Sequence, residues 1–475
     1  MTAARTVART AARTAGRAPL AAEIRATLAV AAPLAGANLA QMAMQVTNMV
    51  MVGHLGAVPL AAAGLGAALY ATLLMTCQGV LAAVAPLAAH EVGADDRSSA
   101  GGIAGAGIIV AALLAAPVIA VLTLVPLLLA ALGYAPHLIA GIGAFLRVVC
   151  WGAPAFLGVA VLRFLLVAVF RVRIVMLVSL LAVPLNAALN WVLIFGHLGM
   201  PELGIRGSAG ATAIVQWLML LCLAGYLVFR SSQIPVSIGR RVLRQIPRIL
   251  RLGLPIGALR ALEIGLFVTT GILMGVLGAD ALGAHQLVFN VVGVCFMVPL
   301  GLSQAATVRV AVQLGAGAPG AAQRAGFVAL ALGVVFMVGT AVLLLTAPRT
   351  LVGLYLDLAD PANRGLVAIA LHLFFIAALF QVFDGMQVIA VGALRGYQDT
   401  AVPMLIAAIG YWAIGFAGGC ALAFPLEFGA VGLWLGLAAG IAVVAVSLTV
   451  RLHVCARAHI LTAAAIPLAA GRLPA

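Results

Sequence analysis

The stretch GIAGAGIIVAALLAAPVIAVLTLVPLLLAAL at residues 102–132 contains no charged residue. As an α-helix it is longer than the roughly 30 Å hydrocarbon core of a bilayer. Over the whole chain of 475 residues, apolar residues make up 65% and charged residues 8%, whereas an ordinary soluble domain has about 25% charged residues. This composition cannot cover a water-facing surface, which excludes soluble enzymes, nucleic-acid-binding proteins and disordered scaffolds. The sequence predicts a polytopic membrane protein.

Similar apolar runs recur along the chain, separated by polar or Gly/Pro-containing breaks. Inside a bilayer every backbone N–H and C=O group must be hydrogen-bonded within its segment, so these runs are expected to be helices. The sequence therefore predicts an all-α protein with twelve membrane spans, at residues 28–52, 60–90, 102–132, 139–169, 174–196, 207–229, 250–277, 282–313, 322–346, 366–393, 401–423 and 430–453.

The arginine residues divide the chain and predict its orientation. We expect an Arg-rich tail at residues 1–25, a six-helix bundle at 26–229, an Arg-rich linker at 230–249, a second bundle at 250–455 and a tail at 456–475. Since basic loops stay in the cytoplasm, both termini are expected on the cytoplasmic side of an inner membrane. The N-terminal tail also has the composition of a transit peptide, but a tail that touches anionic headgroups is the simpler interpretation.

The two halves of the chain resemble each other. When the second half is laid over the first at one constant offset and without a gap, Pro33 falls on Pro255 and Gly79 on Gly301, and Leu55-Gly56-Ala57 falls on Leu277-Gly278-Ala279. Because each half has an even number of spans, the halves share one topology. This is the parallel-repeat plan of alternating-access transporters, which bind substrate between the halves near the midplane of the membrane.

Two acidic residues fall inside predicted spans, Glu263 in span 7 and Asp384 in span 10. A carboxylate at that depth costs roughly 2.5–3.5 kcal/mol on insertion scales, which makes each a candidate functional residue. The repeat aligns Glu263 with Gln41 and, at an offset two residues larger in its later part, Asp384 with Ala160, so that only one half carries the charge. Two carboxylates facing one cavity could bind a cation, or one of them could carry a proton. Arg260 offers the alternative that Glu263 is neutralised locally, three residues away on its own helix.

The remaining polar residues at depth are neutral amides or arginines. In the first half the amides are Asn38, Gln41, Gln45, Asn48, Asn186 and Asn190. Each one either contacts substrate or hydrogen-bonds a neighbouring helix. Arg147 and Arg163 in span 4 require partners that the sequence does not identify. The chain lacks a P-loop, a GxGxxG motif before a soluble helix, an HExxH motif and a nucleophile elbow. We therefore expect no cofactor, and energy from an ion gradient.

Several long segments resemble signatures of multidrug and toxic compound extrusion (MATE) transporters, in particular the NorM-type bacterial branch. They are ALFQVFDGMQVIAVGALRGYQDTAVPM (378–404), PLNAALNWVLIFGHLGMPELGIRGSAGA (184–211), NMVMVGHLGAVPLAAAGLG (48–66), LGLPIGALRALEIGLF (252–267) and LGAHQLVFNVVGVCFMVPLGLSQAATVRVAVQLGAG (282–317). The resemblance covers essentially the whole chain after about residue 25.

This resemblance implies two pseudo-symmetric six-helix bundles in a V-shaped pump that exports small amphipathic or cationic drugs and toxins in exchange for Na⁺ or H⁺. It implies that Glu263 and Asp384 are the cation-site acids of the C-terminal lobe, and that they are ligands of a metal ion, Na⁺ alone, only if sodium is the coupling ion. It adds Gln381, Gln387 and Asn290 as polar cavity residues. The partners are then the drugs and the lipid bilayer, without nucleic acid, and a monomer is expected to suffice.

Two positions depart from the family pattern. Many relatives have Asp in span 1 where this chain has Asn48, and Arg260 beside Glu263 is not expected of the family. The coupling route through the N-terminal lobe is thereby in doubt, and the choice between Na⁺ and H⁺ stays open.

Two other classes of function would make different demands on the sequence. A flippase for a lipid-linked precursor would need a cavity lined by arginines, for which Arg147, Arg163 and Arg260 are the available residues. An intramembrane enzyme would need a paired nucleophile and base, and the sequence indicates no such pair.

Overall fold

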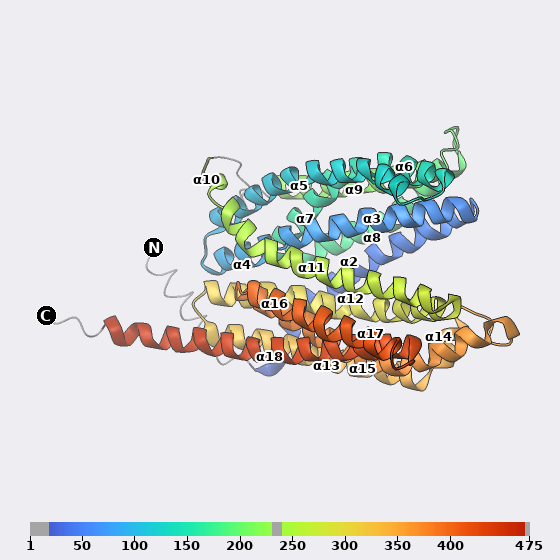
Figure 1. Ribbon diagram of the computed structural model, residues 1–475. Coiled ribbons are helices and arrows are strands. Elements are labelled where there is room, and N and C mark those ends of the chain that lie inside the picture. Colours follow the sequence, from blue (N-terminus) through green and yellow to red (C-terminus); the bar gives the residue numbers. More distant parts are fainter. Residues whose placement is uncertain (1–18, 230–239, 471–475) are drawn as a thin grey trace. The chain divides into compact units, whose positions relative to one another are not determined.

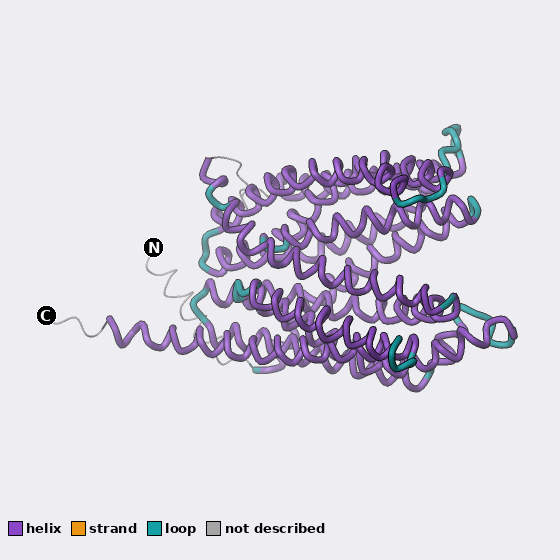
Figure 2. The backbone as a smooth tube through the Cα atoms, viewed as in Figure 1, coloured by secondary structure: helices purple, strands orange, loops and turns teal. Residues whose placement is uncertain are grey.

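The computed structural model describes residues 19–229 and 240–470, which fold into helices joined by short loops, without a strand in those residues (Figure 2). Twelve of the described segments are long and apolar enough to cross a membrane. Several helices begin where the sequence supplies a start signal, such as the proline in the first position of α6 and α13. Asp96 caps α5 by accepting a hydrogen bond from the backbone N–H of Ser99. The expected all-α membrane fold is confirmed.

The first half of the chain contributes six of these spans (Figure 1). They are formed by α2 (Leu20–Gly53), α3 (Ala57–Leu81) with α4 (Val84–Gly93), α5 (Arg97–Ala131), α6 (Pro136–Val149) with η1 (Cys150–Gly152) and α7 (Ala153–Ala168), α8 (Val172–Phe195) and α9 (Ile205–Phe229).

The second half repeats this pattern after the short α10 (Arg240–Leu243). Its spans are formed by α11 (Ile246–Leu277), α12 (Ala279–Gly315), α13 (Pro319–Thr346), η2 (Pro361–Asn363) with α15 (Arg364–Gly396), α16 (Ala401–Ala408) with η3 (Ile409–Phe416) and α17 (Ala417–Ala423), and α18 (Gly429–Ala470), while the short α14 (Pro348–Gly353) follows α13. The segment η3 is a π-helix within span 11, which the sequence predicted as an ordinary helix.

The ends of the bundles differ from those expected from the sequence. Helix α2 begins at Leu20, inside the expected tail, and α18 continues to Ala470, past residue 455. Residues that favour a helix, such as Ala, Leu, Glu and Arg, continue across both of those boundaries without a glycine or proline, so that nothing stops the helix there. Part of the linker, residues 230–239, and most of the N-terminal tail lie outside the described residues.

The chain divides into two compact units whose boundaries lie within helices. One, here called the N-terminal unit, is Gly36–Gly257. The other, the C-terminal unit, is the chain before Gly36 and after Gly257. The boundaries after Ala35 and Gly257 are related by the same offset that aligns the two halves of the sequence. A division at the linker was expected. The structure instead assigns the start of α2 to the C-terminal unit and the start of α11 to the N-terminal unit.

Glycines account for this exchange of helix starts. A Cβ atom on Gly301 of α12 would lie 2.8 Å from the backbone oxygen of Ala31 and from the nitrogen of Ala35 on α2. At the equivalent place in the N-terminal unit, a Cβ atom on Gly79 of α3 would lie 2.8 Å from the Cα atom of Gly257 on α11. In each unit, the first part of a helix that continues into the other unit therefore packs backbone to backbone on the second span. The two contact positions, Gly79 and Gly301, are equivalent in the internal repeat.

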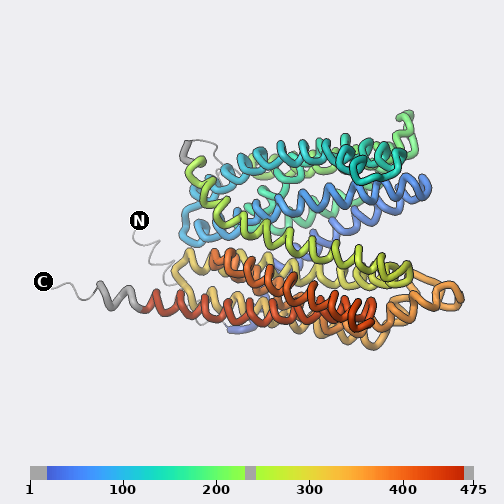
Figure 3. The backbone as a smooth tube through the Cα atoms, in the orientation of Figure 1, coloured from blue at the N-terminus to red at the C-terminus, as the bar shows by residue number. Residues whose placement is uncertain are grey.

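In the C-terminal unit, α15 is the central helix. It packs against α12, α13 and α18, and Figure 3 shows α15 (orange) and α18 (red) running side by side. Hydroxyl groups bind α12 to α15, since Ser303 donates a 2.7 Å hydrogen bond to the Val388 carbonyl and Thr307 donates one of 2.7 Å to the Gly392 carbonyl. These bonds fix the rotation of α15, and with it the direction in which Asp384 points.

Candidate functional site

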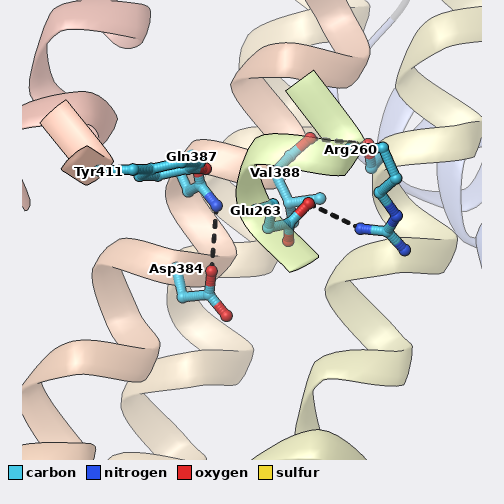
Figure 4. A network of polar contacts seen from close by, with 7 residues as sticks. Arg260, Glu263, Asp384, Gln387, Val388 and Tyr411 are labelled. Atoms are coloured by element: carbon cyan, nitrogen blue, oxygen red, sulfur yellow. Dashed lines mark hydrogen bonds and ion pairs between the residues drawn. The ribbon is translucent and has the colours of Figure 1, made fainter. Parts of the chain in front are cut away.

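The C-terminal unit brings the two predicted acids into one buried cluster. Glu263 on α11 is 7% exposed, and Asp384 on α15 is 5% exposed. Figure 4 shows both side chains between α11 and α15, together with Arg260, Gln387 and Tyr411. They are close enough for the charges of Glu263 and Arg260 to act on Asp384. We call these five residues the acidic cluster.

The two acids have different partners. Arg260 Nη1 lies 2.8 Å from Glu263 Oε2, so that Glu263 forms an ion pair with the arginine one turn before it. Asp384 has an amide partner instead, because Gln387 Nε2 donates a 3.1 Å hydrogen bond to Asp384 Oδ1. With all three groups ionised, the two carboxylates and the one guanidinium leave a single negative charge in the cluster. The site can therefore balance one monovalent cation or one proton.

Tyr411 is the member of the cluster that the sequence analysis missed. It comes from η3, is 1% exposed, and donates a hydrogen bond from its hydroxyl to Gln387 Oε1. Its signal in the sequence is weak, because a tyrosine beside a tryptophan in an apolar span is typical of any buried helix. Trp412 brings η3 against α11, since a Cβ atom on Gly265 would lie 3.2 Å from its ring.

Close packing holds the turn of α15 that carries Asp384. A Cβ atom on Gly385 would lie 2.6 Å from Met337 of α13 and 3.5 Å from Pro299 of α12. Gln381, one turn before Asp384, is fully buried, and both of its amide atoms lack a hydrogen-bond partner. Buried amides are nearly always hydrogen-bonded, so this one has unused capacity for a ligand or a water molecule beside the acid.

Aromatic rings adjoin the cluster on the same helices. Phe267 lies one turn after Glu263 and Phe380 one turn before Asp384, and their ring centroids are 6.4 Å apart. Phe380 also contacts Trp434 of α18 at 5.6 Å, and Trp434 donates a hydrogen bond to the Nδ1 atom of the buried His285. This aromatic group was not predicted from the sequence. The spacing of four residues from each acid was the available signal.

Asn290 does not join this cluster. It is exposed on α12, and its amide donates to the carbonyl of Gln286 on its own helix at 2.8 Å. Its hydrogen bond is therefore local, and it is not one to the two acids.

The N-terminal unit contains two separate groups of polar residues. In the first, Asn190 donates to Asn48 at 2.8 Å and to the Asn186 carbonyl at 2.8 Å, and Asn48 donates to Thr212 at 3.2 Å. In the second, the buried Arg163 donates to the side-chain oxygens of Asn38 and Gln41. Gln45 is exposed. Most of the predicted amides thus bind one another or an arginine.

No carboxylate lies among these N-terminal groups. The described acids of that unit are Glu91, Asp95, Asp96 and Glu202, which lie in or beside loops or, for Glu91, near the end of α4 in an ion pair with Arg248. The amide network therefore holds helices α2, α8 and α9 together without a charge of its own. Within residues 19–229 and 240–470 there is also no cluster of three or more His, Cys, Asp or Glu side chains of the kind that holds a metal ion.

Comparison with known proteins agrees with both halves of this architecture. The MatE family model matches residues 33–192 and again residues 255–421, and the two matches start at Pro33 and Pro255, the pair that the internal repeat aligns. A probable multidrug resistance protein NorM from Burkholderia mallei is 46% identical over 429 residues, which cover 90% of this chain and 92% of the relative.

The multidrug resistance protein NorM of Burkholderia vietnamiensis is 45% identical over 432 residues, which cover 90% of this chain and 93% of that protein. Among solved structures, the crystal structure of the eukaryotic MATE transporter AtDTX14 matches with a TM-score of 0.84 at 21% identity, and the match covers 94% of this chain and 99% of that one. At that identity the likeness concerns the fold.

Proposed function

Because the chain belongs to the MatE family, in its NorM-type bacterial branch, we propose that it exports amphipathic, often cationic compounds from the cell in exchange for a cation. It is a multi-pass membrane transporter rather than an enzyme. In this proposal the chain lies in the inner membrane, with both termini in the cytoplasm as the arginine distribution predicts. A monomer uses the gradient of Na⁺ or H⁺ across that membrane and needs no cofactor.

The observation that carries this proposal is the acidic cluster. Two carboxylates are buried in one unit and a single arginine balances one of them. A buried uncompensated charge is costly, so the site has a strong preference for some cation. If the coupling cation and a cationic drug are both attracted by that negative charge, the binding of each weakens the binding of the other. Such mutual weakening is the condition for exchange.

The aromatic rings beside the cluster support the same class of substrate. Phe267, one turn from Glu263, is half-buried and can present its ring to a ligand, while Phe380, one turn from Asp384, is buried against it. Flat aromatic faces attract organic cations and bury apolar rings. An amphipathic cation thus meets an acid and an apolar aromatic surface in the same part of the C-terminal unit.

The arginines give no support to a lipid-precursor flippase. Arg260 is bound to Glu263 and Arg163 to two amide oxygens, while Arg147 is exposed and donates to a carbonyl of its own helix. Each of the three is thus already hydrogen-bonded to a neighbour within its own unit.

We expect bacterial cells that lack their own major efflux pumps to accumulate less ethidium when they produce this protein. The gradient-driven exchange is the physical reason, so ionophores that collapse both the Na⁺ and H⁺ gradients should restore accumulation to the level of cells carrying an empty vector. The measurement is ethidium fluorescence over time, with protein levels matched by immunoblot. Equal accumulation in producing and non-producing cells, for ethidium and for a panel of cationic dyes, would contradict the proposal.

A further inference from the structure

Gln387 connects Asp384 to the π-helical segment of span 11. It is 2% exposed, and its two amide atoms have different partners: Nε2 donates to Asp384, and Oε1 accepts from the Tyr411 hydroxyl (Figure 4). The chain Tyr411–Gln387–Asp384 is therefore a continuous series of hydrogen bonds that all run toward the acid.

The chemistry of the three groups allows this series to run in either direction. An ionised carboxylate only accepts hydrogen bonds, whereas a protonated one can donate. A tyrosine hydroxyl can do both, and an amide presents a donor at one end and an acceptor at the other. When Asp384 is protonated, a half-turn of the Gln387 amide lets the acid donate to Oε1 and lets Nε2 donate to the Tyr411 oxygen. Both protonation states then keep two hydrogen bonds.

The partners of the two acids favour a proton over a metal cation. A hard cation requires several oxygen atoms whose lone pairs point at it. Here N–H groups point at both acids, Arg260 at Glu263 and Gln387 at Asp384, and the Gln387 oxygen points to Tyr411. A proton requires only one carboxylate oxygen and a neighbour that can exchange donor for acceptor. Asp384 has such a neighbour, and Glu263 is already balanced by its arginine.

Among the residues that the structure describes, the charges that act on Asp384 are those of Glu263 and Arg260 on α11. Helices α13 and α12 present Met337 and Pro299 to the adjacent turn. On α18, Trp434 lies against Phe380 and donates to His285 of α12. Farther off, Arg395 on α15 acts on Arg260, Glu263 and Tyr411. The remaining ionisable groups of these helices include Arg309 and Arg451, bound to Glu23 and Asp399, with Asp280, Arg324 and Arg349 near helix starts.

We propose that the exchanged cation is a proton carried by Asp384, and that Tyr411, acting through Gln387, is the positioning residue that connects the protonation of this acid to span 11. This inference rests on the proposed antiport and identifies its coupling ion. Protonation reverses the Gln387 amide, and Tyr411 changes from donor to acceptor. Tyr411 belongs to η3, so this change in hydrogen bonding affects a π-helical turn that lacks the regular hydrogen bonds of an α-helix. Such turns are frequent at functional sites.

The first test measures the proton directly and needs no transported substrate. The full-length protein, reconstituted in phosphatidylcholine liposomes, is titrated by infrared difference spectroscopy in NaCl or in choline chloride of equal ionic strength. We expect the C=O band of a protonated carboxyl, absent in Asp384→Asn, with the same midpoint pH in both salts. A midpoint lowered by Na⁺ would overturn the inference, because sodium would then compete for the acid. Since no drug is present, a failure of the proposed drug export does not affect this result.

The second test examines Tyr411. In Tyr411→Phe the amide of Gln387 loses the donor that polarises it, so its N–H stabilises the ionised acid less. We expect the midpoint of the Asp384 band, and with it the pH profile of ethidium transport driven by a pH gradient, to move upward by about 0.5–1 pH unit.

The matched control is Tyr397→Phe, which changes another buried tyrosine of the same unit, whose ring contacts that of His459 at a tilt outside the cluster. Its midpoint should equal that of the unchanged protein. A merely structural role for Tyr411 would lower the transport rate at every pH without moving the midpoint. That outcome, or an equal shift in Tyr397→Phe, would overturn the positioning role.

Discussion

Replacing Asp384 with asparagine is expected to abolish ethidium efflux while leaving the protein folded. The amide has nearly the same shape as the carboxyl, and its oxygen can still accept the hydrogen bond from Gln387 Nε2. The variant can neither carry a proton nor supply the negative charge that Arg260 leaves unbalanced. Efflux measured in cells should therefore fall to the level of cells without the transporter, whereas the elution profile and the thermal midpoint of the purified protein should stay close to those of the unchanged chain.

Asp280→Asn is the matched control for this substitution. Asp280 lies in the first turn of α12 in the same unit, but it is exposed and outside the acidic cluster. The same chemical change should leave efflux intact there. Normal efflux by Asp384→Asn would remove Asp384 from the coupling mechanism, even though the family assignment would stand.

The spans and the two acids could be predicted because each depends on a local property of the sequence. An apolar run long enough to cross a bilayer must be helical there whatever surrounds it. A lone acid within such a run, such as Asp384, needs a polar neighbour, and Gln387, three residues later on the same helix face, supplies it. The pairing of Arg260 with Glu263 also follows from spacing, since residues three apart share a helix face.

The rest depends on contacts between distant segments or on the rotation of a helix. Asn290 was expected as a polar cavity residue; it is exposed on α12 and donates to its own helix, and a span that is apolar all round gives little indication of which side is buried. The packing of the start of α2 on Gly301 joins residues far apart in the chain, so glycine spacing alone did not reveal it. Tyr411 lies in the π-helix η3, whose wider turn changes the side to which the tyrosine points. The apolar sequence pattern gives no sign of such a turn.

Alanine at Gly436 is expected to destabilise the protein strongly, because α18 and span 11 touch there backbone to backbone. A Cβ atom at Gly436 would lie 2.2 Å from the Cα atom of Gly419, and one at Gly440 would lie 2.6 Å from the carbonyl oxygen of Gly410. Backbone atoms cannot rotate out of the way as a flexible side chain can. The two helices must separate, at a cost of about 1–3 kcal/mol or more for an overpacked contact.

A neighbouring glycine supplies the control for this prediction. A Cβ atom at Gly418 of α17 would meet nothing within 4 Å, although the residue is adjacent to Gly419 in the chain. Gly418→Ala should therefore leave the thermal midpoint unchanged or raise it slightly, since alanine favours a helix by roughly 0.5–1 kcal/mol over glycine. Equal midpoints for Gly436→Ala and Gly418→Ala in detergent would show that the close contact does not limit stability.

The same contact links the stability of span 11 to its chemistry. Gly410 and Gly415 lie within η3, and both approach α18 at Gly440, so the glycines hold the π-helical turn that carries Tyr411. A larger residue at Gly436 acts one or two turns away from Tyr411, and the separation of the helices should loosen its bond to Gln387. We therefore expect Gly436→Ala to lower efflux more than its loss of folded protein explains, when rates are divided by the amount of folded transporter. Gly418→Ala should transport at the full rate per folded molecule, because it leaves the contact between η3 and α18 intact.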